Sequence, residues 1–248
     1  MMRIDKYLAD CGVGTRSEVK KYIKNKLINV NGVTISKPDI KVEEGKDIVC
    51  YRNKEVHYEK YVYYLFHKPA GCVTAKQDNL HKTVLDYFPD DIPQDISPVG
   101  RLDLDTEGLL LLTNDGPLTH HLLSPTHHIP KAYFAMLDKE VPQEAVDLFK
   151  TGVDIGDDKP CLPAELIILS KEEISSFIDV SENRDCCYGA TLTIHEGRFH
   201  QVKRMFETVG CTVTYLKRIS MGSITLGDLK IGEYRRLTEK EVSSLQIN

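Results

Sequence analysis

The 248-residue sequence predicts an α+β protein, and three observations lead to that prediction. Helical and strand-like segments interleave along the chain without a regular βαβ repeat. The hydrophobic and charged fractions, 41% and 28%, are typical of a globular protein that buries a sizeable core. Residues 1–26 carry a net charge of +4, so the rest of the chain carries −9 of the total of −5. We therefore expect a small basic domain followed by a larger acidic one.

The N-terminal region predicts two helices and a hairpin. Apolar residues with helical spacing indicate a short helix over residues 3–10. Thr15 and Glu18 form the sequence pattern of a capping box, which opens a second helix. Asn31-Gly32 then joins two β-branched runs, and this dipeptide is a strong signal for a tight hairpin turn.

Basic residues line these two helices, and the region resembles the S4 RNA-binding module. A single lysine on a helix usually belongs to an ordinary solvated surface, and that interpretation stays open here. Five basic residues between positions 16 and 26 nevertheless favour contacts with phosphates. The candidate RNA contacts in this module are Arg3, Lys6, Arg16, Lys20, Lys21 and Lys24.

The polar residues 52–60 are expected to form a linker, so the predicted domains are 1–60, which includes the linker, and 61–248. The four leucines of residues 109–112 fit a buried strand or a helix fragment, and the Asn-Asp-Gly that follows favours the strand. A mixed, mostly antiparallel sheet flanked by helices is expected, and Phe199 is expected on the apolar side of one helix. Further strands are predicted near 61–68, 131–137, 162–170, 175–181, 189–197, 212–219 and 224–237, and helices near 117–123, 142–151, 199–208 and 238–246.

Several classes of function lack support in the sequence. The seven cysteines are scattered without a CxxC pair and fit reduced thiols. Glycine motifs for nucleotide cofactors are absent, and no run approaches the roughly 18 apolar residues of a membrane span. The paired histidines of "HHLLSPTHH" (120–128) would suit a metal-dependent hydrolase, but no cysteine lies near and Ser-Pro separates the pairs. We therefore predict no metal, no cofactor, no membrane partner, a cytoplasmic location and a monomer.

The segment "GRLDLDTEGLLLLTNDG" (100–116) joins a charged loop to an apolar strand. A buried strand fixes the end of the loop before it, so this loop is a rigid place to hold a carboxylate. Taken alone, Asp103 is one of three acids beside the strand, and a structural role is at least as well supported. Asp105 in particular suits a cap or a local ion pair.

This segment resembles the signature loop of the pseudouridine synthases, in the branch that acts on ribosomal RNA. The similarity continues, in the family's order, through "HKPAG" (67–71), "KAY" (131–133), "EGRFHQVKRM" (196–205) and "LKRISMGSITLGDLKIGEYRRLT" (216–238). The resemblance implies that the N1–C1′ bond of a uridine breaks and that C5 of the uracil then bonds to C1′. That isomerisation needs no cofactor, because nothing is oxidised or reduced.

The resemblance also implies site residues. The family's aspartate corresponds to Asp103, whose ionised carboxylate is available as nucleophile or base. Attack at C1′, attack on the uracil ring and removal of a ribose proton all stay open. The basic residue that pairs with it corresponds to Lys203, with Arg204 as the fallback, and the family's tyrosine corresponds to Tyr133, which is expected to stack on the uracil near C5. The target base must leave its stack, and Arg101 is the candidate for holding the opened RNA. Arg198 and Arg204 are further candidate RNA contacts.

The substrate is predicted as one uridine of 16S ribosomal RNA, because "SPTHHIPKAY" and "EGRFHQVKRM" are most similar to the small-subunit enzymes. The substrate is expected either as free RNA or within a partly assembled small subunit. A synthase acting on 23S RNA is the near alternative. A non-catalytic S4-domain protein that binds RNA or assists ribosome assembly is the alternative from another class.

Overall fold

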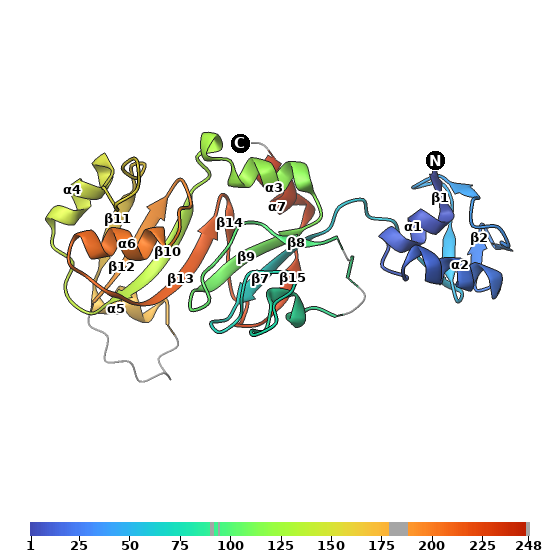
Figure 1. Ribbon diagram of the computed structural model, residues 1–248, viewed down its shortest axis with the longest axis horizontal. Helices are drawn as coiled ribbons and strands as arrows, with labels where there is room; N and C mark the ends of the chain where they lie inside the picture. Colours follow the sequence, from blue (N-terminus) through green and yellow to red (C-terminus); the bar gives the residue numbers. More distant parts are fainter. Residues whose placement is uncertain (90–91, 94, 179–187, 247–248) are drawn as a thin grey trace. The chain divides into compact units, whose positions relative to one another are not determined.

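The computed structural model describes residues 1–89, 92–93, 95–178 and 188–246. The chain divides into two compact units, Met1–Val62 with Phe88–Ile96 and Tyr63–Tyr87 with Ser97–Asn248 (Figure 1). The predicted division into 1–60 and 61–248 differs in two respects: it places the boundary two residues earlier, and it assigns residues 88–96 to the second domain. Across the described ranges, no helix is long and apolar enough to cross a membrane.

The first unit contains the two predicted helices and two small sheets. The capping box is confirmed, because the Thr15 hydroxyl accepts from the amide of Glu18 and the Glu18 carboxylate accepts from the amide of Thr15. The hairpin is confirmed too, with φ of 50° at Asn31 and 79° at Gly32, as a type I′ turn requires. The strands pair in the orders β1-β4 and β3-β2-β5-β6. The elements are β1 (Met2–Arg3), α1 (Ile4–Asp10), α2 (Arg16–Lys24), β2 (Ile28–Val30), β3 (Val33–Thr34), β4 (Lys41–Val42), β5 (Val49–Tyr51) and β6 (Lys54–Glu55).

The segment predicted as a linker is partly built into this unit. Lys54–Glu55 pair with β5 as strand β6, and Val56 and Tyr58 pack against the unit's core. That core holds the buried faces of both helices, including Leu8 and Ile23. Composition hides the strand because both of its residues are charged and exposed.

The second unit is built around one large sheet. Its elements are β7 (Tyr63–Lys68), η1 (Val84–Tyr87), β8 (Ser97–Pro98), β9 (Glu107–Thr113), α3 (Gly116–Leu123), η2 (Pro125–His127), β10 (Lys131–Leu137), α4 (Glu144–Thr151), β11 (Glu165–Leu169), α5 (Lys171–Ser175), β12 (Tyr188–Ile194), α6 (Gln201–Thr208), β13 (Val213–Met221), β14 (Ile224–Thr225), β15 (Tyr234–Arg236) and α7 (Glu239–Gln246). The strand order is β11-β12-β10-β13-β9-β7-β15, with β14 beside β13 and β8 beside β9.

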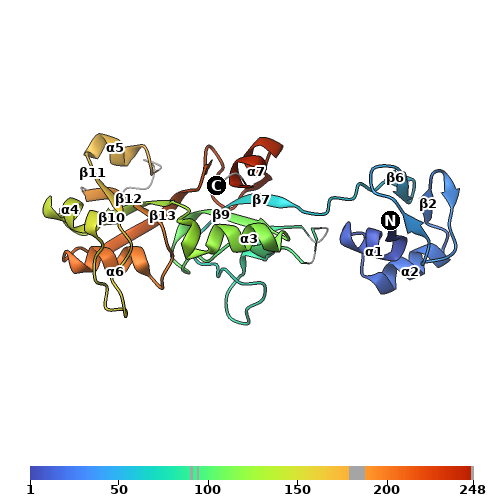
Figure 2. The ribbon, with the colours of Figure 1, turned by 90° about the horizontal axis from the view of Figure 1, so that it is seen from above.

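The predicted fold class, α+β with a mixed and mostly antiparallel sheet, is confirmed. Within the described strands of this sheet, β13 and β9 pair in parallel and the other pairs are antiparallel. Helices cover both faces, and Figure 2 shows α5 and α6 on opposite sides of β10 and β12. The parallel pair joins the strands β11-β12-β10-β13 to the strands β9-β7-β15. It therefore brings the segment before β9 next to β13.

The four leucines form a strand that is buried on both faces, as predicted. Leu109, Leu110, Leu111 and Leu112 are at most 3% exposed, and they lie in the middle of the sheet between β13 and β7. Leu109 and Leu111 belong to a core cluster that also contains residues of α3 and α7. The loop before β9 is therefore attached to one of the most rigid parts of the molecule.

Two predictions about the second unit are wrong. The strand predicted over 175–181 is absent over 175–178, where helix α5 ends and a turn follows, and residues 179–181 lie outside the described residues. Ser170 caps α5 and fixes its start, so the helix runs to Ser175 and a turn follows over 176–178. Phe199 is not on a buried helix side: α6 begins at Gln201, and Phe199 lies before it with 76% of its surface exposed.

Candidate active site

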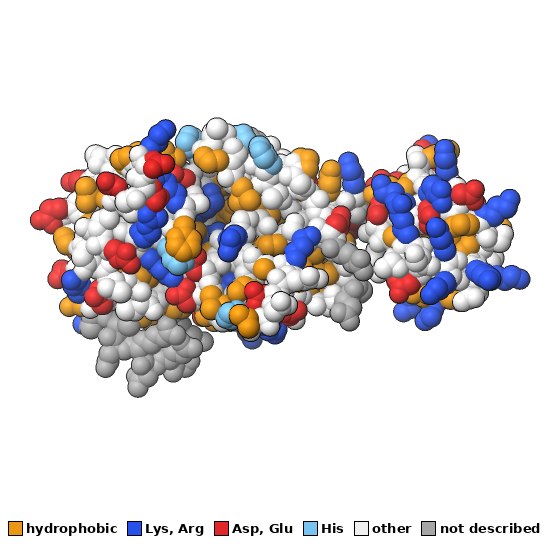
Figure 3. Space-filling model, viewed as in Figure 1, with side chains coloured by type: hydrophobic (Ala, Val, Ile, Leu, Met, Phe, Trp, Pro, Cys, Tyr) orange, Lys and Arg blue, Asp and Glu red, His pale blue; other side chains and the backbone are white. Residues whose placement is uncertain are grey.

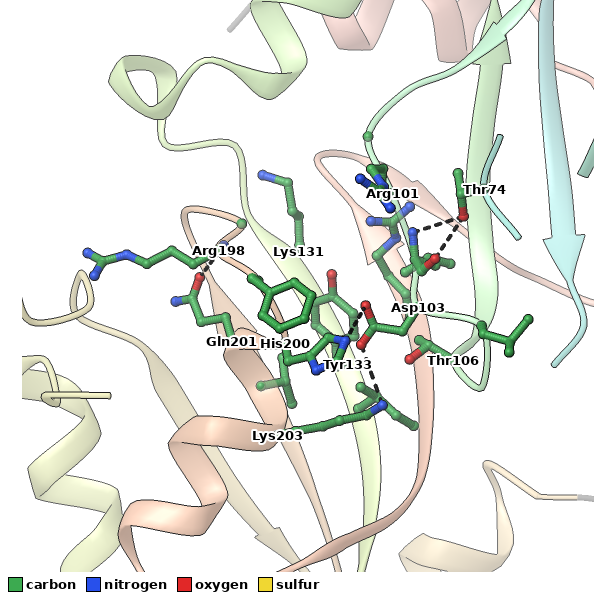
Figure 4. Close-up of a pocket in the computed structure, with 18 of the residues that line it drawn as sticks. Thr74, Arg101, Asp103, Thr106, Lys131, Tyr133, Arg198, His200, Gln201 and Lys203 are labelled. Atoms are coloured by element: carbon green, nitrogen blue, oxygen red, sulfur yellow. Dashed lines mark hydrogen bonds and ion pairs between the residues drawn. The ribbon is translucent and has the colours of Figure 1, made fainter. Parts of the chain in front are cut away.

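A cleft of about 750 Å³ lies in the second unit. Its walls come from the loop before β9, from β10 and β13, and from the turn that precedes α6. Asp103, Tyr133 and Lys203, which are far apart in the sequence, all line it (Figure 4). The fold thus brings the three predicted catalytic residues to one cavity.

Lys68 fixes the loop that carries Asp103. It is the last residue of β7, is completely buried, and pairs in register with Gly108 at the start of β9. Its ammonium donates to the backbone oxygens of Asp103 (3.0 Å) and Thr106 (2.9 Å), and more weakly to that of Leu104 (3.4 Å). Burial lowers the pKa of Lys68. Hydrogen bonds from a charged donor are among the strongest in proteins, so this side chain holds the loop firmly.

The Asp103 carboxylate lies between two basic side chains of the turn and helix opposite. Lys203 Nζ is 3.4 Å from Oδ2, and His200 Nε2 is 3.5 Å from Oδ1 (Figure 4). The carboxylate is 30% exposed, so it is open to a ligand in the cleft. These two contacts hold the carboxylate in a fixed direction at the edge of the cleft.

Lys203 is shared between two carboxylates. It donates to both Asp105 oxygens, at 2.7 and 2.9 Å, which is closer than its approach to Asp103. Burial alone would raise the pKa of Asp105, but the hydrogen bond and charge of Lys203 lower it overall. Asp105 is 70% exposed, so it anchors the lysine from the solvent side while Asp103 faces the cleft.

Tyr133 forms part of the cleft from strand β10. It is 8% exposed and stands opposite Arg218 of β13. Close approach of β13 to β9 requires Gly108, since a Cβ there would lie 2.2 Å from the backbone oxygen of Arg218. This contact sets the distance between the wall that carries Tyr133 and the loop that carries Asp103.

The turn before α6 is held together by polar side chains. Gln201 donates to Glu196 (3.1 Å) and accepts from the amide of Arg198 (3.0 Å), and Arg198 in turn bonds Glu196. His200 adopts a left-handed conformation, with φ of 48°, and its ring stacks on Phe199 with centroids 3.8 Å apart. The turn therefore aims His200 at Asp103 and leaves Phe199 exposed at the cleft. In the described part of the chain, no three His, Cys, Asp or Glu side chains are grouped to hold a metal.

Comparison with known families agrees with this geometry. The model of the RNA pseudouridylate synthase family matches residues 62–208, which contain Asp103, Tyr133 and Lys203, and the S4 domain model matches residues 2–48. The chain belongs to the RNA pseudouridylate synthase family. Its S4 domain is the predicted basic module, so the synthase carries a domain of an RNA-binding type.

Relatives of this synthase cover nearly the whole chain. It is 37% identical to "Ribosomal large subunit pseudouridine synthase B" of Bacillus subtilis, over 99% of this chain and 96% of that protein. It is 36% identical to "Ribosomal small subunit pseudouridine synthase A" of Vibrio cholerae, over 98% of this chain and 99% of that protein. A crystal structure of a pseudouridylate synthase, 33% identical, covers 99% of this chain and all of its own, with a TM-score of 0.66.

The predicted RNA contacts of the synthase fall into two groups. Lys6, Arg16, Lys20, Lys21 and Lys24 are exposed on the S4 domain, where Figure 3 shows basic side chains gathered on one face. Arg101 is exposed at the cleft. The others are engaged within the protein: Arg3 with Asp5, Arg204 with Asp157, and Arg198 with Glu196 and with backbone oxygens of residues 159 and 160.

Sequence reasoning missed several residues of the site. Lys68 lies in the quoted segment "HKPAG", but nothing in the sequence says that its ammonium reaches a loop 35 residues away. His200 is not among the predicted site residues, although it lies three positions before Lys203 in the quoted segment 196–205. Phe199 is predicted on the apolar side of a helix, whereas it lies exposed at the cleft. Lys131 and Arg218 line the cleft as well, and their charge inside strands was the available signal.

Proposed function

We propose that this synthase isomerises one uridine of 16S ribosomal RNA to pseudouridine, with Asp103 as the catalytic carboxylate. The observation that supports the proposal best is the position of that carboxylate, which faces a cleft beside Tyr133 and between Lys203 and His200. The cleft has the size of a nucleotide-binding pocket, and the base enters it after leaving the RNA stack.

Each side chain has a task in this proposal. Asp103 acts as the nucleophile toward C1′ or the uracil ring, or as the base that removes a ribose proton, in the steps that break the N1–C1′ bond. Lys203 and His200 keep the carboxylate in place, and the lysine compensates its charge. Tyr133 stacks on the freed uracil as it turns to present C5, and it lies near the proton that C5 must lose after the new bond forms.

The S4 domain is proposed to supply affinity that does not depend on sequence. Its exposed basic residues, Lys6, Arg16, Lys20, Lys21 and Lys24, are suited to phosphate contacts along the RNA backbone. The catalytic unit then selects the uridine that fits the cleft, with Arg101 holding the opened RNA. We propose that the protein acts as a monomer in the cytoplasm, on free RNA or on a partly assembled small subunit, without metal or cofactor.

The choice of 16S RNA is supported by the segments 124–133 and 196–205 and by the Vibrio cholerae relative. A second candidate substrate is 23S RNA, because the relative from Bacillus subtilis that carries the large-subunit name is equally similar. Both candidates share the reaction and the catalytic residues. They differ in the RNA shape that the S4 domain and the cleft accept.

The test is base-resolved mapping of pseudouridine on unmodified 16S and 23S RNA after incubation with the purified protein. Asp103→Asn is the main variant, since it keeps the shape of the side chain and removes its charge. Asp105→Asn is the matched control, because Asp105 also binds Lys203 but faces solvent. The same reactions are repeated on partly assembled small subunits.

We expect one new site in 16S RNA, absent with Asp103→Asn and present with Asp105→Asn. A site in 23S RNA instead would keep the chemistry and replace the substrate. Full conversion by Asp103→Asn would refute Asp103 as the catalytic carboxylate. Tight binding with no conversion of either RNA or of the subunits would favour a non-catalytic RNA-binding factor.

A further inference from the structure

Two buried basic side chains at the cleft take no part in the chemistry proposed above. Lys131 and Arg218 line the cleft but are only 7% and 2% exposed. Lys131 begins β10, and Arg218 lies on the adjacent strand β13, opposite Tyr133. Their side-chain hydrogen bonds go to backbone oxygens: Lys131 Nζ donates to Ile129 (2.9 Å) and Arg218 Nε donates to Leu109 (2.7 Å). Within the described residues, neither forms an ion pair with a carboxylate.

These two cations lack a negatively charged partner among the described residues, and one of their donor atoms is unsatisfied. The Arg218 Nη2 atom is buried and has no hydrogen-bond partner among the described residues. Buried charged groups are ordinarily paired, because removing them from water is costly. Burial is the main cause that lowers the pKa of Lys131 to about 8, and repulsion from the charge of Arg218 adds to it. An anion beside both side chains would cancel that repulsion and accept the remaining donors.

The position of the pair identifies the kind of anion. Lys131 and Tyr133 are two residues apart on one strand, so their side chains leave the same face of the sheet about 7 Å apart. Figure 4 shows Lys131 on one side of Tyr133 and Lys203 on the other, with Asp103 beside the tyrosine ring. A uridine whose ring stacks on Tyr133 and whose sugar meets Asp103 therefore has a flanking phosphate within reach of Lys131.

We propose that Lys131 and Arg218 form a phosphate subsite, which binds a backbone phosphate next to the target uridine. This inference rests on the proposed function, because Asp103 and Tyr133 must hold the uridine for its phosphate to reach the pair. A phosphodiester carries one negative charge and two acceptor oxygens. The lysine supplies a point charge, and the arginine supplies a rigid fork and a fixed positive field.

The subsite would give the flipped nucleotide its register. Contacts to phosphate position a nucleic acid without reading its bases, whereas the base is selected by the pocket. Lys131 lies two residues before Tyr133 on β10, and Arg218 lies opposite Tyr133 on β13. A phosphate bound by this pair would therefore fix the sugar relative to Asp103 before the glycosidic bond breaks. Near-attack positioning of this kind accelerates a reaction without new chemistry.

The experiment uses the full-length protein and an RNA that contains the mapped target uridine. Three substrates are compared: unmodified RNA, RNA with a neutral methylphosphonate on the 5′ side of that uridine, and RNA with one on its 3′ side. The variants are Lys131→Met, which removes the charge, Lys131→Arg, which keeps it, and Lys230→Met as an exposed control. KM, kcat and the unfolding temperature are measured for each.

We expect one of the two methylphosphonates to raise KM by about 10- to 100-fold for the wild type, the range of a hydrogen bond to a charged group. Lys131→Met should cause a similar rise with unmodified RNA and no further rise with that methylphosphonate, whereas Lys131→Arg restores most of the binding. The unfolding temperature of Lys131→Met should stay the same or increase, because this substitution removes an unpaired buried charge.

Equal KM for all three RNAs would overturn the subsite. The subsite would also be overturned if Lys131→Met raised KM but the methylphosphonate raised it further by the same factor as in the wild type. In that case Lys131 would not bind the substrate's phosphate. A lower unfolding temperature with unchanged KM would show a purely structural lysine. If the wild type converts no uridine in any RNA, the proposed function has failed first, and that result is distinct from these.

Discussion

Replacing Lys68 with methionine tests whether one buried cation positions the catalytic loop. Methionine has a similar length and fills the same space, but it cannot donate hydrogen bonds. Lys68 is completely buried and donates to the backbone oxygens of Asp103 and Thr106 at 3.0 and 2.9 Å. Those two residues bracket the loop that carries the proposed catalytic carboxylate, so the loop loses both of its close charged contacts at once.

The size of the effect follows from two opposing contributions. Loss of two hydrogen bonds from a charged donor costs about 3–6 kcal/mol, at about 1.5–3 kcal/mol each. Removal of a buried ammonium relieves a desolvation penalty of a few kcal/mol, which the lowered pKa of Lys68 reflects. The net expectation is a loss of about 1–3 kcal/mol in the free energy of unfolding. Activity should fall further, because a 1 Å misplacement of a reacting group costs about 100-fold.

The assay combines urea unfolding with single-turnover conversion of the mapped RNA. We expect Lys68→Met to lower the rate by about 100-fold at saturating RNA while RNA affinity changes little, since the S4 domain is untouched. Lys230→Met, at an exposed lysine, is the control and should change neither quantity. A Lys68→Met protein that turns over at the wild-type rate would refute the idea that this ammonium holds the Asp103 loop.

Three further predictions concern the cleft and the C-terminal helix. Lys203→Met should reduce turnover by more than Arg204→Met, because Arg204 binds Asp157 instead of the catalytic carboxylate; the reverse order in single-turnover rates would move the functional ion pair to Arg204. Phe199→Ala should weaken RNA binding by about 1–3 kcal/mol without lowering stability, because an exposed ring at the cleft offers a stacking surface to a base; unchanged affinity in a titration would remove that role. Glu241→Gln should lower the free energy of unfolding by about 1 kcal/mol at pH 7, since the partly exposed Arg235 pair is screened by water. The Arg235 hydrogen bond lowers the pKa of Glu241 to about 2, so its contribution is complete above the ordinary value near 4.5 and disappears as the pH falls toward 2; a constant difference between the two proteins across that range in acid-unfolding curves would contradict it.

The local elements could be predicted from the sequence because short-range chemistry specifies them. Thr15 with Glu18 starts α2 through hydrogen bonds within one turn. Asn31-Gly32 makes the hairpin because both residues tolerate positive φ. The leucines of β9 give a strand because a run that is apolar on both faces needs cover on both. The strand predicted over 175–178 is wrong because Ser170 starts a helix that runs to Ser175, and a turn follows it.

The active site is a different case, because its parts come from four segments that are distant in the sequence. The motifs indicated Asp103, Tyr133 and Lys203, but the sequence alone gives no distances. It did not show that Lys203 binds Asp105 more closely than Asp103, or that Arg198 is tied to Glu196 within its own turn. The preference of Lys203 rests on a difference of less than 1 Å, since its Nζ is 2.7 Å from Asp105 and 3.4 Å from Asp103.

By itself, then, the sequence determined which helices and strands form in most of the chain, and it indicated the family and the residues of the reaction. Tertiary structure decided which charges are buried together. Lys68, Lys131 and Arg218 lie in predicted strands, which is a signal of burial, but the sequence does not show what their side chains contact. Burial is a property of the whole sheet. Strands β11-β12-β10-β13 and β9-β7-β15 join where β13 runs beside β9. This junction forms the cleft, buries its cations and fixes the position of Asp103.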